Sequence, residues 1–180
     1  MTALHEVVGC QPGVRGDPGP ADRAAVARWA HRVGAGAGVM MAAGAGVNTV
    51  LVTVRPDVYR ALGAWFVEVS PWSLAPQMRL WSATFAAHPR VWGVVVGVGL
   101  EAAVGALALS GDPRRRAAGL AGVSAFHLGL LGMGLWAWAL PVLAVVVPAT
   151  AVTAAATRRA SAASCRGREP DAPNPTGGDV

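Results

Sequence analysis

The chain has 180 residues, a length that allows a single domain. Hydrophobic residues make up 53% of it and charged residues only 14%, whereas a soluble domain usually has about 25% charged residues. Because both ends of the sequence are polar, the middle must be more apolar than the mean hydropathy of +0.43. The composition therefore excludes a disordered chain, disfavours a soluble globular domain and points to a membrane protein.

The chain has 15 basic residues, all of them arginine, and 10 acidic residues, which gives a formal net charge of +5. The arginines flank apolar segments instead of forming one basic face, so we expect no nucleic acid as a partner. The two cysteines, Cys10 and Cys165, lie in the polar tails and have no CxxC or metal-ligand spacing. They predict neither a metal site nor a thiol-redox pair inside the membrane.

Residues 1–32 predict a cytoplasmic N-terminal tail that ends in a short basic amphipathic helix over residues 23–32. The next stretch, residues 33–54, carries no charge and is long enough for a spanning helix, which needs about 20 residues. Because it lies too far from the N-terminus for an ordinary secretory signal, we expect an uncleaved first span.

Residues 55–90 form a connection in which charged and aromatic side chains alternate. The charges exclude a span, and the aromatic rings suit the headgroup layer of a bilayer. We expect one or two short helices lying in that layer, broken at the prolines near residues 70–71 and 75–76. All seven tryptophans of the chain fall near predicted interfaces and are interpreted as belt residues, with Trp65 and Trp72 as candidates to line a pocket.

Two more apolar stretches follow. The second predicted span is apolar except for Glu101, and a basic turn at residues 110–116 ends it. Residues 117–157 then hold no acidic or basic side chain apart from His127. This stretch is about twice as long as one span. A break near residues 132–138, where Trp136 and Trp138 mark an interface, divides this stretch, and Pro141 suits the first turn of the last helix. The predicted spans are therefore residues 33–54, 91–109, 117–136 and 140–157, and residues 158–180 are expected to be a disordered cytoplasmic tail.

The arginines predict the orientation of these spans. Eleven of the 15 lie in the N-terminal tail, the basic turn and the C-terminal segment: Arg15, Arg23, Arg28, Arg32, Arg114, Arg115, Arg116, Arg158, Arg159, Arg166 and Arg168. With four spans these segments share one side, which the positive-inside rule assigns to the cytoplasm of a bacterial inner membrane. The expected fold is an all-α integral membrane four-helix bundle over residues 33–157, with short interfacial helices in its first extracytoplasmic loop.

Glu101 is the strongest candidate functional residue. It lies about 15 Å into the second span at 1.5 Å per residue, near the midplane of a core about 30 Å thick. Gly93, Gly97 and Gly105 share its four-residue spacing, and such a small-residue stripe is where another helix packs closely. Glu101 is thus expected to face the bundle. It either carries a proton or binds a polar headgroup, or it is a protonated carboxyl that ties two helices together.

His127 is expected at a similar depth in the third span, with Ser124 on the same face. The turn at residues 110–116 makes the second and third spans antiparallel neighbours, so a contact between Glu101 and His127 is possible. The alternative is that His127 only bonds one helix to another. Two histidine ligands for haem or a metal are not present within the predicted spans.

Three further features could bind a ligand or a partner. Asn48 lies in the outer half of the first span, four residues after Gly44, and is either a ligand-binding group or a helix-bridging amide. Arg114, Arg115 and Arg116 mainly set topology, and they could also hold anionic lipid or an acidic partner. A second small-residue stripe, which offers a packing face or a homo-oligomer contact, consists of Gly34, Gly38, Ala42 and Gly46.

The order of these features resembles the DoxX-like membrane proteins, which are small four-helix bacterial proteins. The similarity covers roughly residues 38–150. It rests on GAGVN at residues 44–48, RPDVY at 55–59, GLEAAVGALAL at 99–109 and RRAAGL at 115–120. The Glu-led run with its basic turn is the most specific part. Family members often have a lysine after the asparagine of the first span, and this chain departs from that pattern with Thr49.

The resemblance implies a four-helix membrane subunit in which Asn48 and Glu101 are family polar positions. Some relatives belong to a thiosulfate:quinone oxidoreductase and others to oxidoreductase complexes linked to thiol and oxidative stress. The first hypothesis is therefore a redox-complex subunit with Glu101 and His127 near a quinone, while a partner protein supplies the cofactor. The alternative is a non-enzymatic scaffold or lipophilic-ligand-binding protein in which both residues are structural. A small proton-coupled exporter is a third hypothesis.

Overall fold

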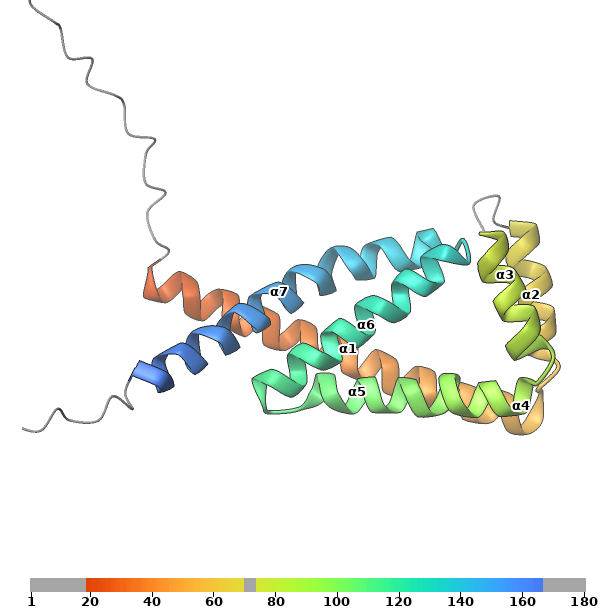
Figure 1. The fold of residues 1–180 in the computed structure, drawn as a ribbon, viewed down its shortest axis with the longest axis horizontal. Helices are drawn as coiled ribbons and strands as arrows, with labels where there is room; N and C mark the ends of the chain where they lie inside the picture. Colours follow the sequence, from red (N-terminus) through yellow and green to blue (C-terminus); the bar gives the residue numbers. More distant parts are fainter. Residues whose placement is uncertain (1–18, 70–73, 167–180) are drawn as a thin grey trace, which may run out of the picture.

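A computed structural model of the chain describes residues 19–69 and 74–166 (Figure 1). The described part is all-helical, as the sequence predicts, and contains no strand. Its elements are α1 (Pro20–Val54), α2 (Val58–Val69), α3 (Ala75–Trp81), η1 (Ser82–Ala86), α4 (Pro89–Trp92), η2 (Gly93–Leu100), α5 (Glu101–Leu109), α6 (Pro113–Gly132) and α7 (Trp136–Arg166). The two η elements are π-helical. Cys10, Trp72 and the outer parts of both predicted tails lie outside the described residues. The inner part of the predicted C-terminal tail, residues 158–166, is not disordered, because it continues helix α7.

Three of the described helical stretches are long and apolar enough to cross a membrane: Pro20–Val54, Pro89–Leu109 and Trp136–Ala162. They contain the predicted first, second and fourth spans, and they indicate a membrane protein. Helix α6, which contains most of the predicted third span, is not among the three. It is less apolar because its first turn holds three consecutive arginines and its middle holds Ser124 and His127.

The long helices form two antiparallel pairs that meet at one end and diverge at the other (Figure 1). The first pair consists of α1 and the continuous stretch α4–η2–α5, which lie side by side along most of their length. The second pair consists of α6 and α7. The shorter helices α2 and α3 stand across the open end, roughly perpendicular to the long helices (Figure 1).

Each end of the molecule has its own apolar core. Where the pairs meet, buried side chains from all four long helices pack together, including Met41, Val104, Leu120 and Val146. We call this the arginine end, because the start of α1, the turn between α5 and α6 and the last turns of α7 all lie there: Arg28, Arg32, Arg114, Arg115, Arg116, Arg158 and Arg159. At the open end a second core, the aromatic cap, is built from Val52, Tyr59, Phe66 and Trp81, with Phe85 packed against it.

Glycines let the helices approach closely within the chain. A Cβ at Gly105 would lie 3.0 Å from the carbonyl oxygen of Gly38, and one at Gly119 would overlap the backbone of Ala108. Gly34 packs against the side chain of Arg116. Intramolecular packing therefore occupies the stripe of the second span and half of the stripe of α1, while Gly46 meets no neighbouring atom within 4 Å.

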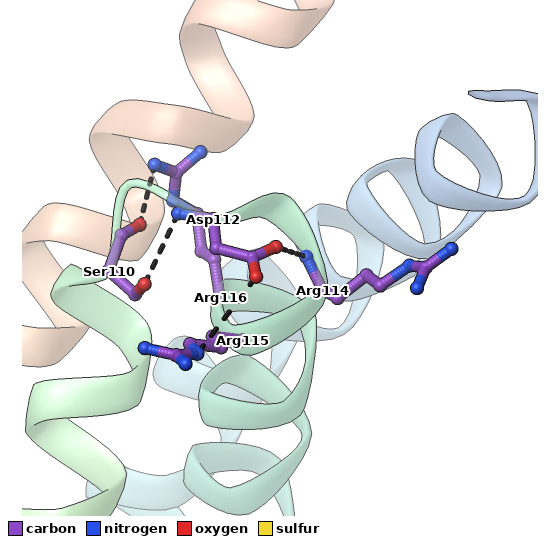
Figure 2. Close-up of polar contacts among 5 residues, drawn as sticks. All are labelled: Ser110, Asp112, Arg114, Arg115 and Arg116. Carbon is purple, nitrogen blue, oxygen red and sulfur yellow. Dashed lines mark hydrogen bonds and ion pairs between the residues drawn. The ribbon is translucent and has the colours of Figure 1, made fainter. Parts of the chain in front are cut away.

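The basic turn between α5 and α6 is a capped helix start (Figure 2). The Asp112 side chain accepts a hydrogen bond from the backbone N–H of Arg114 at 2.8 Å, and Pro113 occupies the first helical position. The Arg116 guanidinium donates to the Ser110 carbonyl at 2.8 Å, and Arg115 forms a long ion pair with Asp112 at 3.9 Å. The turn is therefore only three residues long, and α6 begins four residues before the predicted start of the third span.

The break between α6 and α7 falls within residues 132–138, as the sequence predicts, but the helix bounds differ from the predicted ones. Helix α6 ends at Gly132 and α7 begins at Trp136, so the tryptophan starts the last helix and Pro141 lies inside it. Gly134 adopts a φ of 86°, and the N–H groups of Gly134 and Leu135 bond back to the carbonyls of Leu131 and Leu130. This glycine-based C-cap explains why α6 ends at Gly132, four residues before the predicted end of the third span, because a residue in the left-handed conformation terminates a helix.

The helix bounds in two other segments can be compared with the predictions. The basic stretch over residues 23–32 is helical but continues without a break into the first span as part of α1. In the connection over residues 55–90, α2 ends at Val69, next to the predicted first break. The second predicted break is also next to a helix end, because α3 begins at Ala75 and places Pro76 in its first turn, where the missing N–H costs no hydrogen bond.

Candidate functional site

A cavity of about 440 Å³ lies between the two diverging helix pairs, beneath the aromatic cap. Its walls come from α1, the aromatic cap, η2 with the start of α5, and α6. The lining is mostly apolar, and its residues are Asn48, Tyr59, Leu62, Phe66, Gln77, Leu80, Trp81, Thr84, Phe85, Trp92, Val96, Gly97, Glu101, Ala125, Phe126, Gly129, Leu130 and Met133. This volume is within the range of about 300–1,000 Å³ that is typical of small-molecule sites.

Three polar side chains form a chain of hydrogen bonds on one wall of the cavity. The Tyr59 hydroxyl donates to Asn48 Oδ1 at 2.8 Å, and Asn48 Nδ2 donates to both carboxyl oxygens of Glu101 at 3.3 Å each. Glu101 and Tyr59 are buried, at 6% and 3% exposure, and Asn48 is half-buried. We call Tyr59, Asn48 and Glu101 the polar triad. It joins α2, α1 and α5 and presents its carboxyl group to the cavity.

Small residues make room for the polar triad between α1 and the second span. The Glu101 carboxyl group packs directly against Gly44, and a Cβ at Gly97 would lie 2.8 Å from the Asn48 side chain. Any larger residue at either glycine would displace a member of the triad. The predicted stripe of the second span therefore does face α1, and it turns Glu101 away from lipid.

The aromatic cap holds Tyr59 in place from the other side. Trp81 Nε1 donates to the backbone carbonyl of Tyr59 at 2.9 Å, and the Trp81 ring stacks on Phe85 with a centroid distance of 4.4 Å. Phe66 meets the Trp81 ring edge-on at 5.5 Å. Burial raises the pKa of Tyr59 above its ordinary value, and the charge of Glu101 raises it further. Tyr59 therefore stays a neutral hydrogen-bond donor toward Asn48.

The predicted contact between Glu101 and His127 is not formed. Among the described residues the hydrogen bonds to Glu101 come from Asn48, and His127 Nδ1 bonds instead to the Val123 carbonyl oxygen at 2.9 Å. Ser124 likewise donates to a carbonyl of its own helix, that of Leu120, at 3.0 Å. Neither Ser124 nor His127 lines the cavity, although His127 is almost fully buried at 1% exposure.

The register of α5 and α6 explains why these two residues miss each other. Gly119 packs against Ala108, and Gly122 packs one turn away against Val104. One turn further, the same register brings Ala125 opposite Glu101, and both line the cavity. His127 follows Ala125 by two residues, about 200° around the helix, so it points to the opposite side of α6.

The three arginines of the basic turn do not line the cavity. Arg114 donates to Ser161 of α7 at 2.8 Å, and Arg116 bonds to the Ser110 carbonyl, so both connect helices at the arginine end. Arg115 is well exposed, with 72% of its side-chain surface accessible. These contacts account for a structural role of Arg114 and Arg116.

Several lining residues were not identified from the sequence. Trp65 is exposed and lies outside the lining, whereas Trp81 is buried and lines the cavity together with Trp92. Trp81 is therefore not a belt residue. A signal for the cap was present in the spacing of Tyr59, Leu62 and Phe66, which share one face of a helix.

Within the described residues, no group of three or more His, Cys, Asp and Glu side chains is placed to hold a metal ion. No family model matches this chain, and neither the curated proteins nor the solved structures contain a significant match to it. Membership of the DoxX-like family therefore stays a prediction from the sequence.

Proposed function

We propose that this chain is an integral membrane protein that binds a small lipophilic molecule in the cavity, with Glu101 as the partner of the ligand's polar group. The observation that carries this proposal is the combination of a mostly apolar cavity of about 440 Å³ with the polar triad on one wall. Few polar groups in an apolar cavity fix the orientation of a ligand, which is the usual design of a small-molecule site.

The position of the cavity favours a ligand that arrives from the bilayer. Helix α6 diverges from η2 at this level, and Ala125 is exposed although it lines the cavity. A Cβ at Gly129, on the same face of α6, would meet nothing within 4 Å. Because the aromatic cap covers the outer end, the opening between η2 and α6 is the more direct route for an apolar molecule.

The proposed setting is a bacterial inner membrane crossed four times, with α6 as the third span. The arginine end would face the cytoplasm and the aromatic cap the outside, as the positive-inside rule predicts. The three apolar helices support the membrane location, and the polar turn between α5 and α6 supports the return of the chain to the cytoplasmic side.

The test compares two substitutions that fill different spaces. Gly129→Leu places a side chain at the mouth of the cavity, whereas Gly46→Leu places the same side chain in open space on the outer face of α1. Native mass spectrometry of protein released from its own membrane should show a bound small molecule on the wild type and on Gly46→Leu. Gly129→Leu should lose it. A wild-type protein that carries no more bound mass than Gly129→Leu would refute the proposal.

A second candidate is the membrane subunit of a redox complex, with a quinone in the cavity and the cofactor on a partner protein. The observation that favours it is the polar triad, because it holds a carboxyl group at the cavity wall, and a positioned carboxyl group can deliver a proton to a bound headgroup. Affinity purification in mild detergent should then recover a stoichiometric redox protein together with a quinone. Glu101→Gln should abolish the activity of that complex and leave it assembled. A preparation with neither partner nor quinone would leave only the binding function.

A further inference from the structure

The charged side chains that line the cavity are of one sign. Among the described residues that line it, Glu101 is the only acid, and there is no arginine or histidine. The remaining polar groups are already partly engaged: Gln77 donates to the Gly129 carbonyl and Thr84 to the Leu80 carbonyl. The cavity therefore offers a ligand one carboxyl group and no positive charge.

Aromatic rings line the same cavity as this carboxyl group. Six of the lining side chains are aromatic: Tyr59, Phe66, Trp81, Phe85, Trp92 and Phe126. The faces of aromatic rings attract cations, and the attraction is strongest where water is excluded. A carboxylate within a membrane is costly unless it is paired, so a positive charge on the ligand would also stabilise the ionised form of Glu101.

We propose that the ligand of this cavity is a lipophilic cation, in which an aromatic or otherwise apolar body carries one positive charge next to Glu101. This inference rests on the proposed binding function and names its ligand class. An anion of the same shape would meet the carboxyl group with no compensating charge, because none of the described arginines lines the cavity and His127 faces away from it. The four arginines at the open end, Arg55, Arg60, Arg79 and Arg90, are exposed.

The experiment compares three probes of similar shape and different charge. Tetraphenylphosphonium is a cation, triphenylphosphine oxide is neutral and tetraphenylborate is an anion. Each is equilibrated with the full chain in phosphatidylcholine nanodiscs, and uptake by empty nanodiscs is subtracted. The wild type should bind the cation at least about tenfold more tightly than the neutral probe, and the anion should show no saturable binding.

The variants then locate the source of the preference. The Glu101→Gln variant should still bind the neutral probe, and its affinity for the cation should be within about threefold of its affinity for the neutral probe. Glu101→Asp should retain part of the preference. Gly129→Leu should lose both probes, and Gly46→Leu should bind like the wild type.

The possible failures can be told apart. If the wild type binds the cationic and neutral probes equally well, the inference is overturned and the binding function stands, and this comparison needs no variant to fold. The binding function fails as well if two results coincide. Probe uptake by protein-containing nanodiscs would not exceed that by empty nanodiscs, and native mass spectrometry would find the same bound mass on Gly129→Leu and on the wild type. An unchanged preference in a folded Glu101→Gln variant would also overturn the inference, since the charge would then come from elsewhere.

Discussion

Asn48 of α1 donates its amide to both carboxyl oxygens of Glu101 in α5, 53 residues away in the sequence. The same amide accepts the hydroxyl of Tyr59, so one side chain connects the first span, the second span and the aromatic cap. A buried carboxyl group is thereby satisfied by a neutral donor and keeps acceptor capacity toward the cavity. The packing of the helices and the proposed ligand binding would thus depend on the same pair.

The coupling between Asn48 and Glu101 should be measurable in a double-mutant cycle. With Asn48→Ala, Glu101→Ala and the double variant, thermal unfolding in detergent should give an interaction energy of about 0.6 kcal/mol, and at most about 1.7 kcal/mol, as for other hydrogen bonds between membrane helices. Effects that add within about 0.3 kcal/mol would show that the two side chains do not stabilise each other in the folded protein.

The sequence was sufficient to predict that Glu101 faces another helix, because the stripe of glycines around it is a local pattern. It was not sufficient to choose the partner. Asn48 and His127 were both polar residues within predicted spans, and the choice depends on the register of α6. That register follows from the packing of Gly119 on Ala108 and of Gly122 on Val104, after a turn of only three residues.

The aromatic cap was predictable only in part. Tryptophan, tyrosine and phenylalanine near a membrane boundary fit a belt as well as a packed cluster, and composition does not separate the two. Trp81 became a core residue because α3 folds back over Gly63, where a Cβ would lie 2.8 Å from its ring. Such a tertiary contact has no counterpart in local sequence periodicity.

The crossing of α5 and α6 should tolerate no added methyl group at Gly119. A Cβ at this position would overlap the backbone of Ala108, and backbone cannot move aside as a flexible side chain can. Gly119→Ala should lower the free energy of unfolding by about 1–3 kcal/mol, the usual cost of overpacking. Thermal unfolding in detergent measures the change.

Gly129→Ala is the matched control on the same helix, because its Cβ would meet nothing within 4 Å. It should leave the free energy of unfolding unchanged or raise it slightly, since alanine restricts the unfolded chain more than glycine does. Equal losses in both variants would mean that helix α6 does not approach α5 as closely as the structure shows.

Tyr59 should ionise at higher pH in the folded protein than in the denatured one. It is the only tyrosine of the chain, so the near-ultraviolet absorbance of tyrosinate reports on it alone. Burial raises its pKa first and the charge of Glu101 second, so the folded midpoint should exceed the denatured value of about 10, and Glu101→Gln should lower it only in part. Equal folded and denatured midpoints would contradict the burial of Tyr59.

The same shift gives the sign of the pH dependence of stability. Because the folded pKa of Tyr59 is raised, the neutral hydroxyl stabilises the folded state. This contribution is fully present below about pH 10, the unfolded pKa, and is lost as pH rises through the folded pKa. Tyr59→Phe should remove this part of the alkaline loss of stability while preserving the ring that packs in the aromatic cap.

The number of spans can be tested by the accessibility of single cysteines. In a background with Cys10→Ser and Cys165→Ser, single cysteines replace exposed residues at the two ends of the molecule. The positions are Ala24, Gly111 and Ala162 at the arginine end, and Ser82 of η1 at the open end. If α6 is a span, a membrane-impermeant maleimide added to intact spheroplasts should label only the cysteine at position 82. The other three should react after permeabilisation.

This pattern separates a chain with four spans from one with three. With three spans, from α1, the stretch α4–η2–α5 and α7, the ends of the described chain would lie on opposite sides of the membrane, and cysteines at positions 24 and 162 would differ in labelling. Equal protection of both, together with protection at position 111, requires that α6 returns through the bilayer despite its three arginines. Those arginines would then mark the cytoplasmic boundary of α6 instead of interrupting a span.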